Sequence, residues 1–444
     1  MINLYNTITS KKETITVRDG KALLLYVCGI TPYDYAHIGH GRCYVVFDVL
    51  YRLAKFHKLP IVYCRNFTDI DDKLLHKAHE EFGDKYRYVE IAQRYINAYL
   101  EDMEQLGCTF PDHQPRVTHV IPDIIAFIEL LIKKDAAYVV DGDVYFRVSS
   151  YKPYGTLAKK NLDELQSGAR VQVNEKKENP LDFVLWKGEP QGTFWKSPWG
   201  AGRPGWHTEC CVMAEKYLGD ATIDIHGGGM DLMFPHHENE RAQAEIAFEK
   251  TFSKEWMHIA FVRIDKEKMS KSLGNFFTLR QVFNAFDPMV VRFYLLNHHY
   301  RSPLDFSFHD LEVAEKTYRR LCTFFSQKNC PVTAASLSQH ESPIIKQMLR
   351  FLDDDLNTVG LWGVLFENLD TLGDEFCTIK SFIQNVLGLS LEPLMPKIIC
   401  ITPEIQALMN ERSVARADKD FKRADEIRDQ LRTLGVDVND GKMS

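Results

Sequence analysis

A strand, a turn and a helix near the N-terminus constrain the fold of this chain more than any other stretch. The apolar run Ala22–Val27 is typical of a buried strand, and Val45–Phe56 is an amphipathic run of helical length. A second apolar run, Ile61–Arg65, completes a strand–helix–strand unit. Because such a unit joins parallel strands, the sequence predicts an α/β fold with a parallel sheet.

The turn between that strand and helix has the composition of an anion-binding site. It is rich in Gly and Pro and ends in His37-Ile38-Gly39-His40. A helix N-terminus carries unpaired N–H groups and a positive dipole end, Gly39 lets a flat group approach the backbone, and both histidines can donate to phosphate oxygens. Cys28 ends the strand, where open α/β sheets bind their ligands. The alternative is an ordinary helix start with two solvated histidines and a core cysteine.

Three later loops allow both a functional and a purely structural interpretation. Thr68 and Asp69 either cap the next helix or face a substrate at the sheet edge. The three glycines at 227–229 either let the backbone lie flat against a nucleotide or form a flexible turn. Lys268 and Lys271, which lie among serines and a glycine, either grip an anion or are only solvated.

Composition favours an enzyme of the cytoplasm. The 444 residues are 45% hydrophobic without an apolar run of transmembrane length, and the first residues lack the basic-then-apolar layout of a signal peptide. Ten cysteines are too few for a disulfide scaffold, so we expect a reducing compartment in which they are free thiols, metal ligands or core residues. The net charge of −7 argues weakly against a nucleic-acid binder, although a local basic face can coexist with it.

The α/β pattern is interrupted once and then gives way to helices. Residues 115–205, with a hairpin signal around Asp141-Gly142-Asp143, form the interruption. The pattern resumes with strands at Thr222–His226 and Ile259–Ile264 and a helix at Glu238–Phe248. Beyond residue 310, apolar residues at helical spacing predict a bundle and one last helix. The residues expected on these apolar faces are Leu311, Ala314, Tyr318, Leu321, Phe325, Ile345, Met348, Leu352, Leu356, Val359, Val414, Ala417, Phe421, Ala424, Ile427, Leu431 and Leu434.

A metal site is indicated by thiol, imidazole and carboxylate groups at suitable spacing. His236 and Glu240 are four residues apart, so they project from one face of a helix. With Cys28 and Cys210 they would form a shell that suits zinc. His207, His237 and Cys211 are competing donors. The alternative is a helix N-terminal turn with capping acids and a surface histidine.

Two distant motifs then identify a family resemblance. His37-Ile38-Gly39-His40, followed far downstream by Lys268-Met269-Ser270-Lys271-Ser272, resembles the paired signatures of class I aminoacyl-tRNA synthetases. Five further stretches are similar to the cysteinyl-tRNA synthetase family, and the likeness covers nearly the whole chain, including residues 354–358. These stretches are Cys28–Asp34, Asn66–Lys73, Gly205–Cys210, His226–Gly229 and Phe234–Glu240.

The resemblance implies a domain organisation. A Rossmann-type catalytic domain with a parallel sheet is split by a connective insertion and followed by a C-terminal α-helical bundle and a small terminal module, both reading the anticodon arm of tRNA. The implied boundaries are 1–114 and 206–280 for the catalytic halves, 115–205 for the insertion, 281–310 for a stem-contact segment, 311–392 for the bundle and 393–444 for the terminal module.

The resemblance also selects among the metal donors and assigns site residues. It implies zinc ligands at Cys28, Cys210, His236 and Glu240. This chain departs from the family at Cys211, where relatives usually have a small non-thiol residue, and its place beside Cys210 makes it an alternative thiol ligand. The implied catalytic residues are His37, His40, Lys268 and Lys271. The implied ATP-binding residues are His37, Gly39, His40, Gly227, Gly228, Gly229 and Lys271. The implied cysteine-binding residues are Gly29, Thr68 and Trp206. For Trp206 the alternative is a purely structural role in packing.

The implied activity is ATP-dependent ligation of L-cysteine to tRNA(Cys) through a cysteinyl-adenylate, by a monomer that holds one zinc ion and uses Mg²⁺ with ATP. The nearest alternative is a cysteine ligase of the mycothiol pathway, which lacks the helical end. A second alternative is a non-catalytic RNA-binding paralogue, against which the intact signature histidines and lysines argue.

Overall fold

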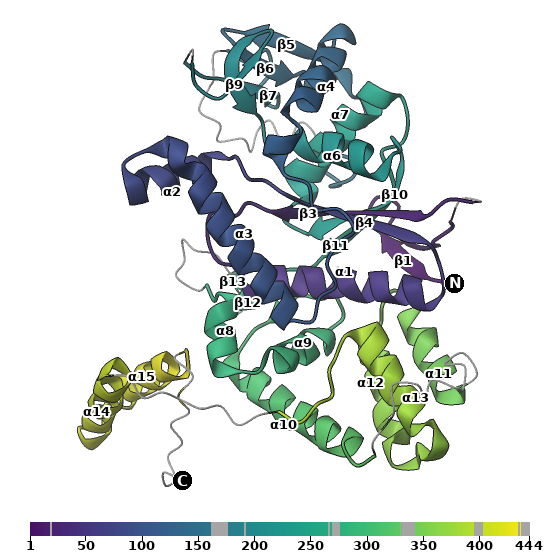
Figure 1. Cartoon of the computed structure of the whole chain (residues 1–444), viewed down its shortest axis with the longest axis vertical. Helices are drawn as coiled ribbons and strands as arrows, with labels where there is room; N and C mark the ends of the chain where they lie inside the picture. Colours follow the sequence, from purple (N-terminus) through teal and green to yellow (C-terminus); the bar gives the residue numbers. More distant parts are fainter. Residues whose placement is uncertain are drawn as a thin grey trace.

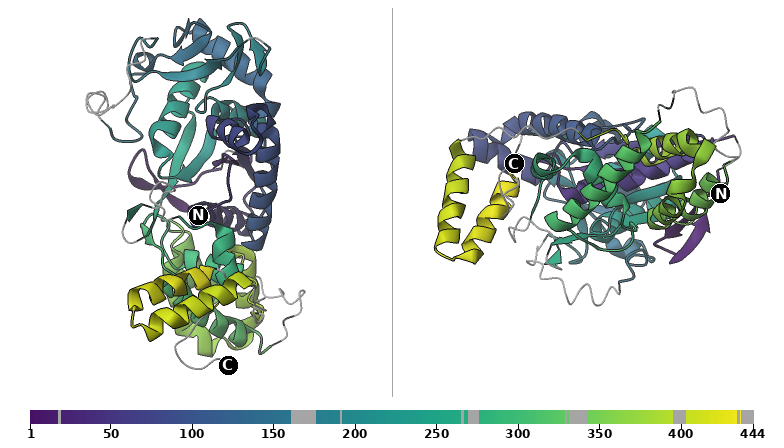
Figure 2. Two further views of the ribbon diagram at one scale, coloured as in Figure 1. Left: turned by 90° about the vertical axis from the view of Figure 1, so that its left-hand side faces the viewer. Right: turned by 90° about the horizontal axis from the view of Figure 1, so that it is seen from below.

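The computed structural model describes residues 1–17, 20–160, 176–190, 192–264, 267–268, 276–328, 330, 342–394, 403–433 and 436. A central α/β sheet lies between a β-rich part at residues 137–204 and a helical part at residues 279–387 (Figures 1 and 2). In the described part of the chain, no helix is both long enough and apolar enough to cross a membrane.

The central sheet has four parallel strands in the order β11 (Ser253–Ile259), β10 (Ile223–Gly229), β3 (Leu23–Ile30) and β4 (Ile61–Phe67). Both faces of β3 are buried in different cores, because side chains alternate between the faces of a strand. Val27 joins the core on the side of α1 (Ile38–Phe56). Cys28 joins the core that holds α6 (Glu209–Leu218) and α7 (Glu238–Phe248). The alternation of β3 therefore directs Cys28 toward these two helices.

The predicted parallel sheet is confirmed, but one predicted strand is wrong. The run Ile259–Ile264 does not form a single strand, because β11 ends at Ile259 and β12 (Val262–Ile264) belongs to a separate sheet. That sheet also contains β13 (Glu267–Lys268) and β14 (Leu304–Asp305). The apolar run spans a change of sheet, which hydropathy alone does not reveal. Strand β11 itself was missed, since Lys254 and Glu255 interrupt its apolar pattern.

An N-terminal hairpin and three further helices lie within residues 3–133. The hairpin strands β1 (Asn3–Asn6) and β2 (Lys11–Thr14) pair antiparallel. The helices are α2 (Asp72–Phe82), α3 (Tyr88–Gln105) and α4 (Ile121–Lys133).

A five-stranded antiparallel sheet lies between β4 and β10 in the chain. Its order is β5 (Ala137–Val140), β6 (Asp143–Phe146), β7 (Phe183–Gly188), β9 (Gly200–Pro204) and β8 (Trp195–Ser197). The predicted hairpin at residues 138–149 is confirmed as β5 and β6. Its two turn residues, Asp141 and Gly142, have φ values of 51° and 85°. Two positive φ values suit the twist of a two-residue hairpin, and Gly adopts them readily.

The part of the chain at residues 279–387 is mainly helical, as predicted. Its elements are α8 (Leu279–Ala285), α9 (Pro288–Leu296), α10 (Phe308–Phe325), α11 (Pro343–Leu352), α12 (Thr358–Asn368) and α13 (Phe376–Phe382). The predicted apolar faces of α10 and α11 are buried, but Val359 is 46% exposed. Asp355 and Leu356 have positive φ, so the helical spacing that begins at Ile345 ends before Val359.

The prediction of a single last helix is wrong, because two helices occupy that region. Helix α14 (Pro403–Ala417) ends before a turn in which Lys419 has a φ of 60°, and α15 (Phe421–Thr433) follows. Val414 and Phe421 flank this turn and are exposed, whereas Ala424, Ile427 and Leu431 are buried. Ile405, Ile427, Leu431 and Val436 form a small core of their own.

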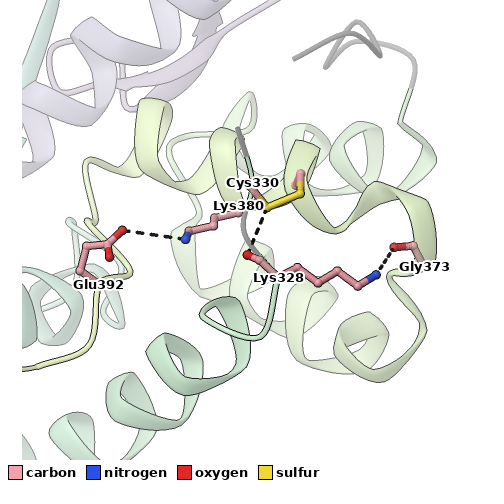
Figure 3. The surroundings of a disulfide bond; sticks show 6 residues. Lys328, Cys330, Gly373, Lys380 and Glu392 are labelled. Carbon is pink, nitrogen blue, oxygen red and sulfur yellow. Dashed lines mark hydrogen bonds and ion pairs between the residues drawn. A yellow bond between two sulfur atoms is a disulfide. The ribbon is translucent and has the colours of Figure 1, made fainter. Parts of the chain in front are cut away.

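One cysteine pair departs from the expectation of reduced cysteines. Cys330, which follows α10, forms a disulfide with Cys377 of α13, with a Cα–Cα distance of 5.3 Å (Figure 3). The pairing was not predictable, because a separation of 47 residues carries no local signal. Of the other cysteines, Cys28, Cys43, Cys64, Cys108, Cys210, Cys211 and Cys322 are buried and free.

Gly227 provides a test of how tightly α1 packs on the sheet. A Cβ added there would lie 2.2 Å from the Phe47 ring of α1, so Gly227→Ala should lower the free energy of unfolding by about 1–3 kcal/mol through overpacking. Gly363→Ala is the matched control, because no heavy atom lies within 4 Å of its added Cβ, and α12 should gain up to ~1 kcal/mol in helix propensity. Urea unfolding followed by circular dichroism measures both. Equal midpoints for the two variants would contradict the expectation.

Candidate active site and metal centre

A cavity of about 490 Å³ opens at the carboxyl ends of the central strands. This edge is where open parallel sheets bind their ligands. Many of the predicted site residues line the cavity although they come from distant parts of the sequence. They are Cys28, Gly29, His37, Gly39, His40, Thr68, Trp206, Cys210, Gly229 and His236.

The two signature histidines cap α1 reciprocally. His37 is the N-cap residue; its Nδ1 accepts from the backbone N–H of His40, and Nδ1 of His40 accepts from the backbone N–H of His37, both at 3.2 Å. The two rings stack with centroids 3.6 Å apart. Because Nδ1 accepts a hydrogen bond in each ring, Nε2 carries the proton of the neutral imidazole. The turn therefore presents two imidazole donors beside the positive end of the helix dipole.

The backbone that follows the lysine loop contacts the histidine turn. Lys268 lies in β13, where its backbone is paired with Arg263 of β12. After the loop, Leu279 donates to the Ala36 carbonyl at 2.7 Å, and the Phe277 carbonyl accepts from Ile38 at 3.3 Å. The backbone that follows the loop is thus bound directly to the start of α1. Lys271 lies outside the described residues.

The four expected metal ligands are brought together and buried. Cys28 Sγ lies 3.7 Å from Cys210 Sγ and 3.5 Å from Glu240 Oε1. His236 Nε2 lies 3.6 Å from Cys210 Sγ and 3.0 Å from Glu240 Oε1. Tetrahedral zinc with ordinary bond lengths to sulfur, nitrogen and oxygen separates its ligands by about 3.3–3.8 Å. The donor atoms therefore fit one metal ion of zinc's size.

The electrostatics of this cluster differ from residue to residue, and burial raises the pKa of the Cys28 thiol well above its usual value. Burial opposes ionisation of Cys210, but hydrogen bonds from the Cys28 thiol and His236 outweigh it and lower the Cys210 pKa to about 6. Burial likewise opposes a charge on His236, but the Glu240 carboxylate raises the His236 pKa to about 10. The pKa of Glu240 is held well below its usual value by His226 and His236 despite burial. The Cys210 thiolate and the Glu240 carboxylate are thus favoured without a metal, whereas a metal would have to displace the protons of Cys28 and His236.

The competing donors have other contacts. Nδ1 of His207 lies 3.0 Å from Nδ1 of His236, so His207 orients the His236 ring from behind. Burial lowers the pKa of His207 to about 3 and keeps it neutral. The thiol of Cys211 faces backbone carbonyls, at 3.3 Å from Glu240 O and 3.9 Å from His207 O. Among the described residues, Cys211 is in neither group of clustered metal donors.

The predicted cysteine-binding residues surround the cluster. Trp206 stacks on His236 with ring centroids 4.4 Å apart, and its side chain is 39% exposed. Thr68 donates to the buried Glu209 carboxyl at 2.8 Å. Gly29 donates its backbone N–H to the Asn66 side chain at 2.8 Å, and an added Cβ would lie 1.5 Å from the Asn66 carbonyl oxygen. No side chain fits at Gly29 without moving β4.

The glycine run after His226 has a different role at each position. Gly227 packs on the Phe47 ring, and a Cβ at Gly228 would meet Leu232 at 2.9 Å and the His237 ring at 3.1 Å. Of the three glycines only Gly229 lines the cavity. The first two therefore allow α1 and the histidine cluster to pack closely.

Two residues near the site had no assigned role in the sequence analysis. Asn66 holds the Gly29 amide and lies 4.0 Å from Cys210 Sγ. His226 lies 3.6 Å from Cys28 Sγ and 3.2 Å from Glu240 Oε2. Their position in the sequence could have indicated that both residues belong to the site, because each lies toward the carboxyl end of a parallel strand, as Cys28 does.

Comparisons with known proteins place this architecture in a class. Residues 14–316 match the family described as tRNA synthetases class I (C) catalytic domain. A putative arginyl-tRNA synthetase from Campylobacter jejuni has a similar fold, with a TM-score of 0.55 at 14% identity over 84% of this chain and 94% of that one. Mycobacterium tuberculosis methionyl-tRNA synthetase in complex with methionyl-adenylate gives a TM-score of 0.54 at 15% identity over 84% and 88%. The fold and the family match define a class I aminoacyl-tRNA synthetase.

The sequence comparisons narrow the class to one family. A cysteine–tRNA ligase from Trichlorobacter lovleyi is 43% identical over 99% of this chain and 98% of that protein. A cysteine–tRNA ligase from Geobacillus thermodenitrificans is 44% identical over 99% of this chain and 97% of that protein. Residues 401–443 match the cysteinyl-tRNA ligase anticodon binding domain. The chain belongs to the cysteine–tRNA ligase family.

A pair of adjacent cysteines tests the ligand set. Cys210→Ser should lower the bound metal by one equivalent per chain relative to the unsubstituted protein, because a serine hydroxyl is a far weaker ligand than a thiolate. Cys211→Ser is the matched control and should retain all the metal, since its side chain faces carbonyl oxygens. Elemental analysis after gel filtration provides the measurement. Loss of metal in Cys211→Ser with retention in Cys210→Ser would reverse the assignment.

Proposed function

We propose that this chain ligates L-cysteine to tRNA(Cys) at the expense of ATP, through a cysteinyl-adenylate. The observation that carries the proposal is the juxtaposition, in one cavity of a cysteine–tRNA ligase family member, of a thiol-selective donor cluster and an anion-binding helix turn. The match of residues 401–443 to an anticodon-binding domain favours tRNA as acceptor over the amino sugar of the mycothiol pathway.

The first step would be attack of the cysteine carboxylate on the α-phosphorus of ATP, which releases pyrophosphate. Negative charge builds on the phosphate oxygens, so preorganised donors aimed at them lower the barrier. Nε2–H of His37 and His40, together with the α1 N-terminus, supply such donors. Lys268 and Lys271 are proposed to hold the β- and γ-phosphates and stabilise the departing pyrophosphate. Mg²⁺ is expected with the ATP.

The nucleotide is proposed to lie against backbone at Gly39 and Gly229, the glycines that line the cavity. Gly227 and Gly228 would contribute indirectly, because their lack of side chains lets α1 and His237 pack against β10. In the second step the terminal ribose of tRNA, through its 2′-hydroxyl, would attack the cysteinyl carbonyl and release AMP. That step needs no covalent nucleophile from the protein.

Selection of cysteine over serine is the most demanding part of this function. Packing alone separates side chains that differ so little by only about 10–200-fold. A zinc ion held by Cys28, Cys210, His236 and Glu240 would favour the substrate's thiolate over a serine hydroxyl, which ionises far less readily. Trp206, stacked on His236, and Thr68, held by Glu209, would confine the substrate beside the cluster.

The proposed activity is tested by charging purified tRNA(Cys) with labelled cysteine or serine. We expect cysteine to be transferred and serine rejected by more than the ~200-fold that packing can supply. Removing the metal with a chelator should abolish this preference, and adding zinc back should restore it. A metal-free protein that still prefers cysteine would overturn the role of zinc, and no charging of tRNA would overturn the ligase activity.

The role of His37 can be separated from its capping of α1. His37→Asn keeps a good N-cap residue but removes the imidazole Nε2–H, so pyrophosphate exchange should slow by about 10²–10³-fold while thermal stability changes little. Ser307→Asn, at the N-cap of α10, is the matched cap substitution outside the cavity and should leave the exchange rate unchanged. An unaltered rate in His37→Asn would remove that residue from phosphate binding.

A further inference from the structure

We infer that Arg65 of β4 is a fixed positive charge behind the anion-binding wall of the cavity, and that its field favours a bound anion without contact. Arg65 is 2% exposed and is not among the described residues that line the cavity. The inference rests on the proposed function, since ATP is the anion concerned. It goes further by assigning a role to a residue outside the binding site.

The fold places Arg65 close to the cavity. It lies toward the carboxyl end of β4, in register with Val27 of β3, and the next residue, Asn66, lines the cavity. The Arg65 guanidinium lies over the ring of Tyr44 in α1, at 4.5 Å from the ring centroid. Tyr44 also lines the cavity. A ring in contact with the buried guanidinium is therefore part of the cavity wall.

The Tyr44 ring also adjoins the histidine turn. The His40 ring is nearly parallel to it, with an interplanar angle of 15° and centroids 6.4 Å apart. The Tyr44 hydroxyl donates to the Cys28 carbonyl at 3.2 Å, which connects α1 to the end of β3. The wall in front of Arg65 is thus the one that carries the proposed phosphate donors.

The charge of Arg65 is less compensated than that of the other buried arginines. Three described arginines are at most 2% exposed. Arg292 forms an ion pair with Asp48, and Arg42 donates to four backbone carbonyl oxygens. Arg65 donates from Nη1 to the Tyr63 hydroxyl at 3.3 Å. Within the described part of the chain its Nε and Nη2 have no hydrogen-bond partner, and no carboxylate pairs with it.

The remaining contacts of Arg65 are with aromatic faces. Its guanidinium lies 5.3 Å from the ring centroid of Tyr99 and 5.7 Å from that of Tyr63. We call Tyr44, Tyr63 and Tyr99 the aromatic cage. Aromatic faces attract a cation but carry no net charge, and a guanidinium remains protonated in proteins. The cage therefore holds the positive charge in place without neutralising it.

The field of this charge reaches the cavity wall. Burial and the Asp231 carboxylate raise the pKa of the Cys43 thiol, whereas Arg65 lowers it, and Cys43 lines the cavity. A charge that favours a thiolate at this wall favours phosphate oxygens there in the same way. An anion beside Tyr44 would lie on the order of 10 Å from the guanidinium, where two unit charges at an effective dielectric constant of ~20 change an equilibrium constant roughly tenfold.

Binding of ATP and of adenosine to the full-length protein, measured by isothermal titration calorimetry, tests this role. Arg65→Met keeps a long side chain that packs well on aromatic rings but removes the charge. We expect the Kd of ATP to rise roughly tenfold and the Kd of uncharged adenosine to change less than ~2-fold. Arg65→Lys keeps the positive charge and should recover most of the affinity for ATP.

A purely structural role for Arg65 predicts a different pattern. If the side chain only fills space, Arg65→Met should weaken the binding of ATP and of adenosine equally and lower the melting temperature. If the charge acts on the anion, the melting temperature should stay the same or rise, because a buried charge without a counter-ion opposes folding. Tyr99→Phe is the matched control, since it removes an unpartnered hydroxyl from the same cage and should leave both Kd values unchanged.

Equal loss of ATP and adenosine binding in Arg65→Met, or unchanged ATP binding, would overturn the role of Arg65. Arg65→Gln, which is also uncharged, replaces Arg65→Met in the comparison should that variant fail to fold. An unsubstituted protein that binds ATP but charges no tRNA would contradict the proposed function alone, because ATP binding decides the role of Arg65. An unsubstituted protein that binds no ATP would overturn both.

Discussion

The functional centre depends on burying thiolate and carboxylate groups at the carboxyl end of β3. The alternation of that strand sends Val27 into one core and Cys28 into the other, where Cys210 of α6 and Glu240 of α7 meet it. Buried negative charges are stable only when they are paired with cations or strong donors. The histidines around the cluster meet part of this requirement, and a metal ion would meet the rest. The fold of the parallel sheet thereby brings residues more than 180 positions apart in sequence together as one set of metal donors.

The anion-binding side of the cavity is organised by the same strand. The turn after β3 leads directly into α1, whose first turn is closed by two histidines that cap each other. The backbone after the lysine loop is bound to this turn through Ala36 and Ile38. One cavity is consequently lined both by the cluster residues Cys28, Cys210 and His236 and by the histidine turn.

The sequence predicted most of the framework because its signals are local. Apolar runs and helical spacing located β3, α1, β4 and α7, and the turn residues Asp141 and Gly142 located the hairpin. The failures share one cause, which is tertiary structure overriding a continuous pattern. The apolar run at Ile259–Ile264 crosses between two sheets, and the spacing from Val414 to Leu431 continues through a turn at Lys419. The disulfide between Cys330 and Cys377 has no local signal at all.

Residue identity alone does not determine the role of each histidine in the site. Six of the histidines in or beside the cavity are distinguished by the partner of Nδ1, which the sequence does not reveal. In His37 and His40, Nδ1 accepts a hydrogen bond from a backbone N–H, so Nε2 of the neutral ring carries the proton. In His236 and His237, Nδ1 instead faces the ring nitrogen of another histidine. His207 and His258 are those partners, and burial lowers the pKa of each to about 3, so both stay neutral. The hydrogen bonds at Nδ1 of each ring, rather than the residue type, therefore distinguish the histidines of this cavity.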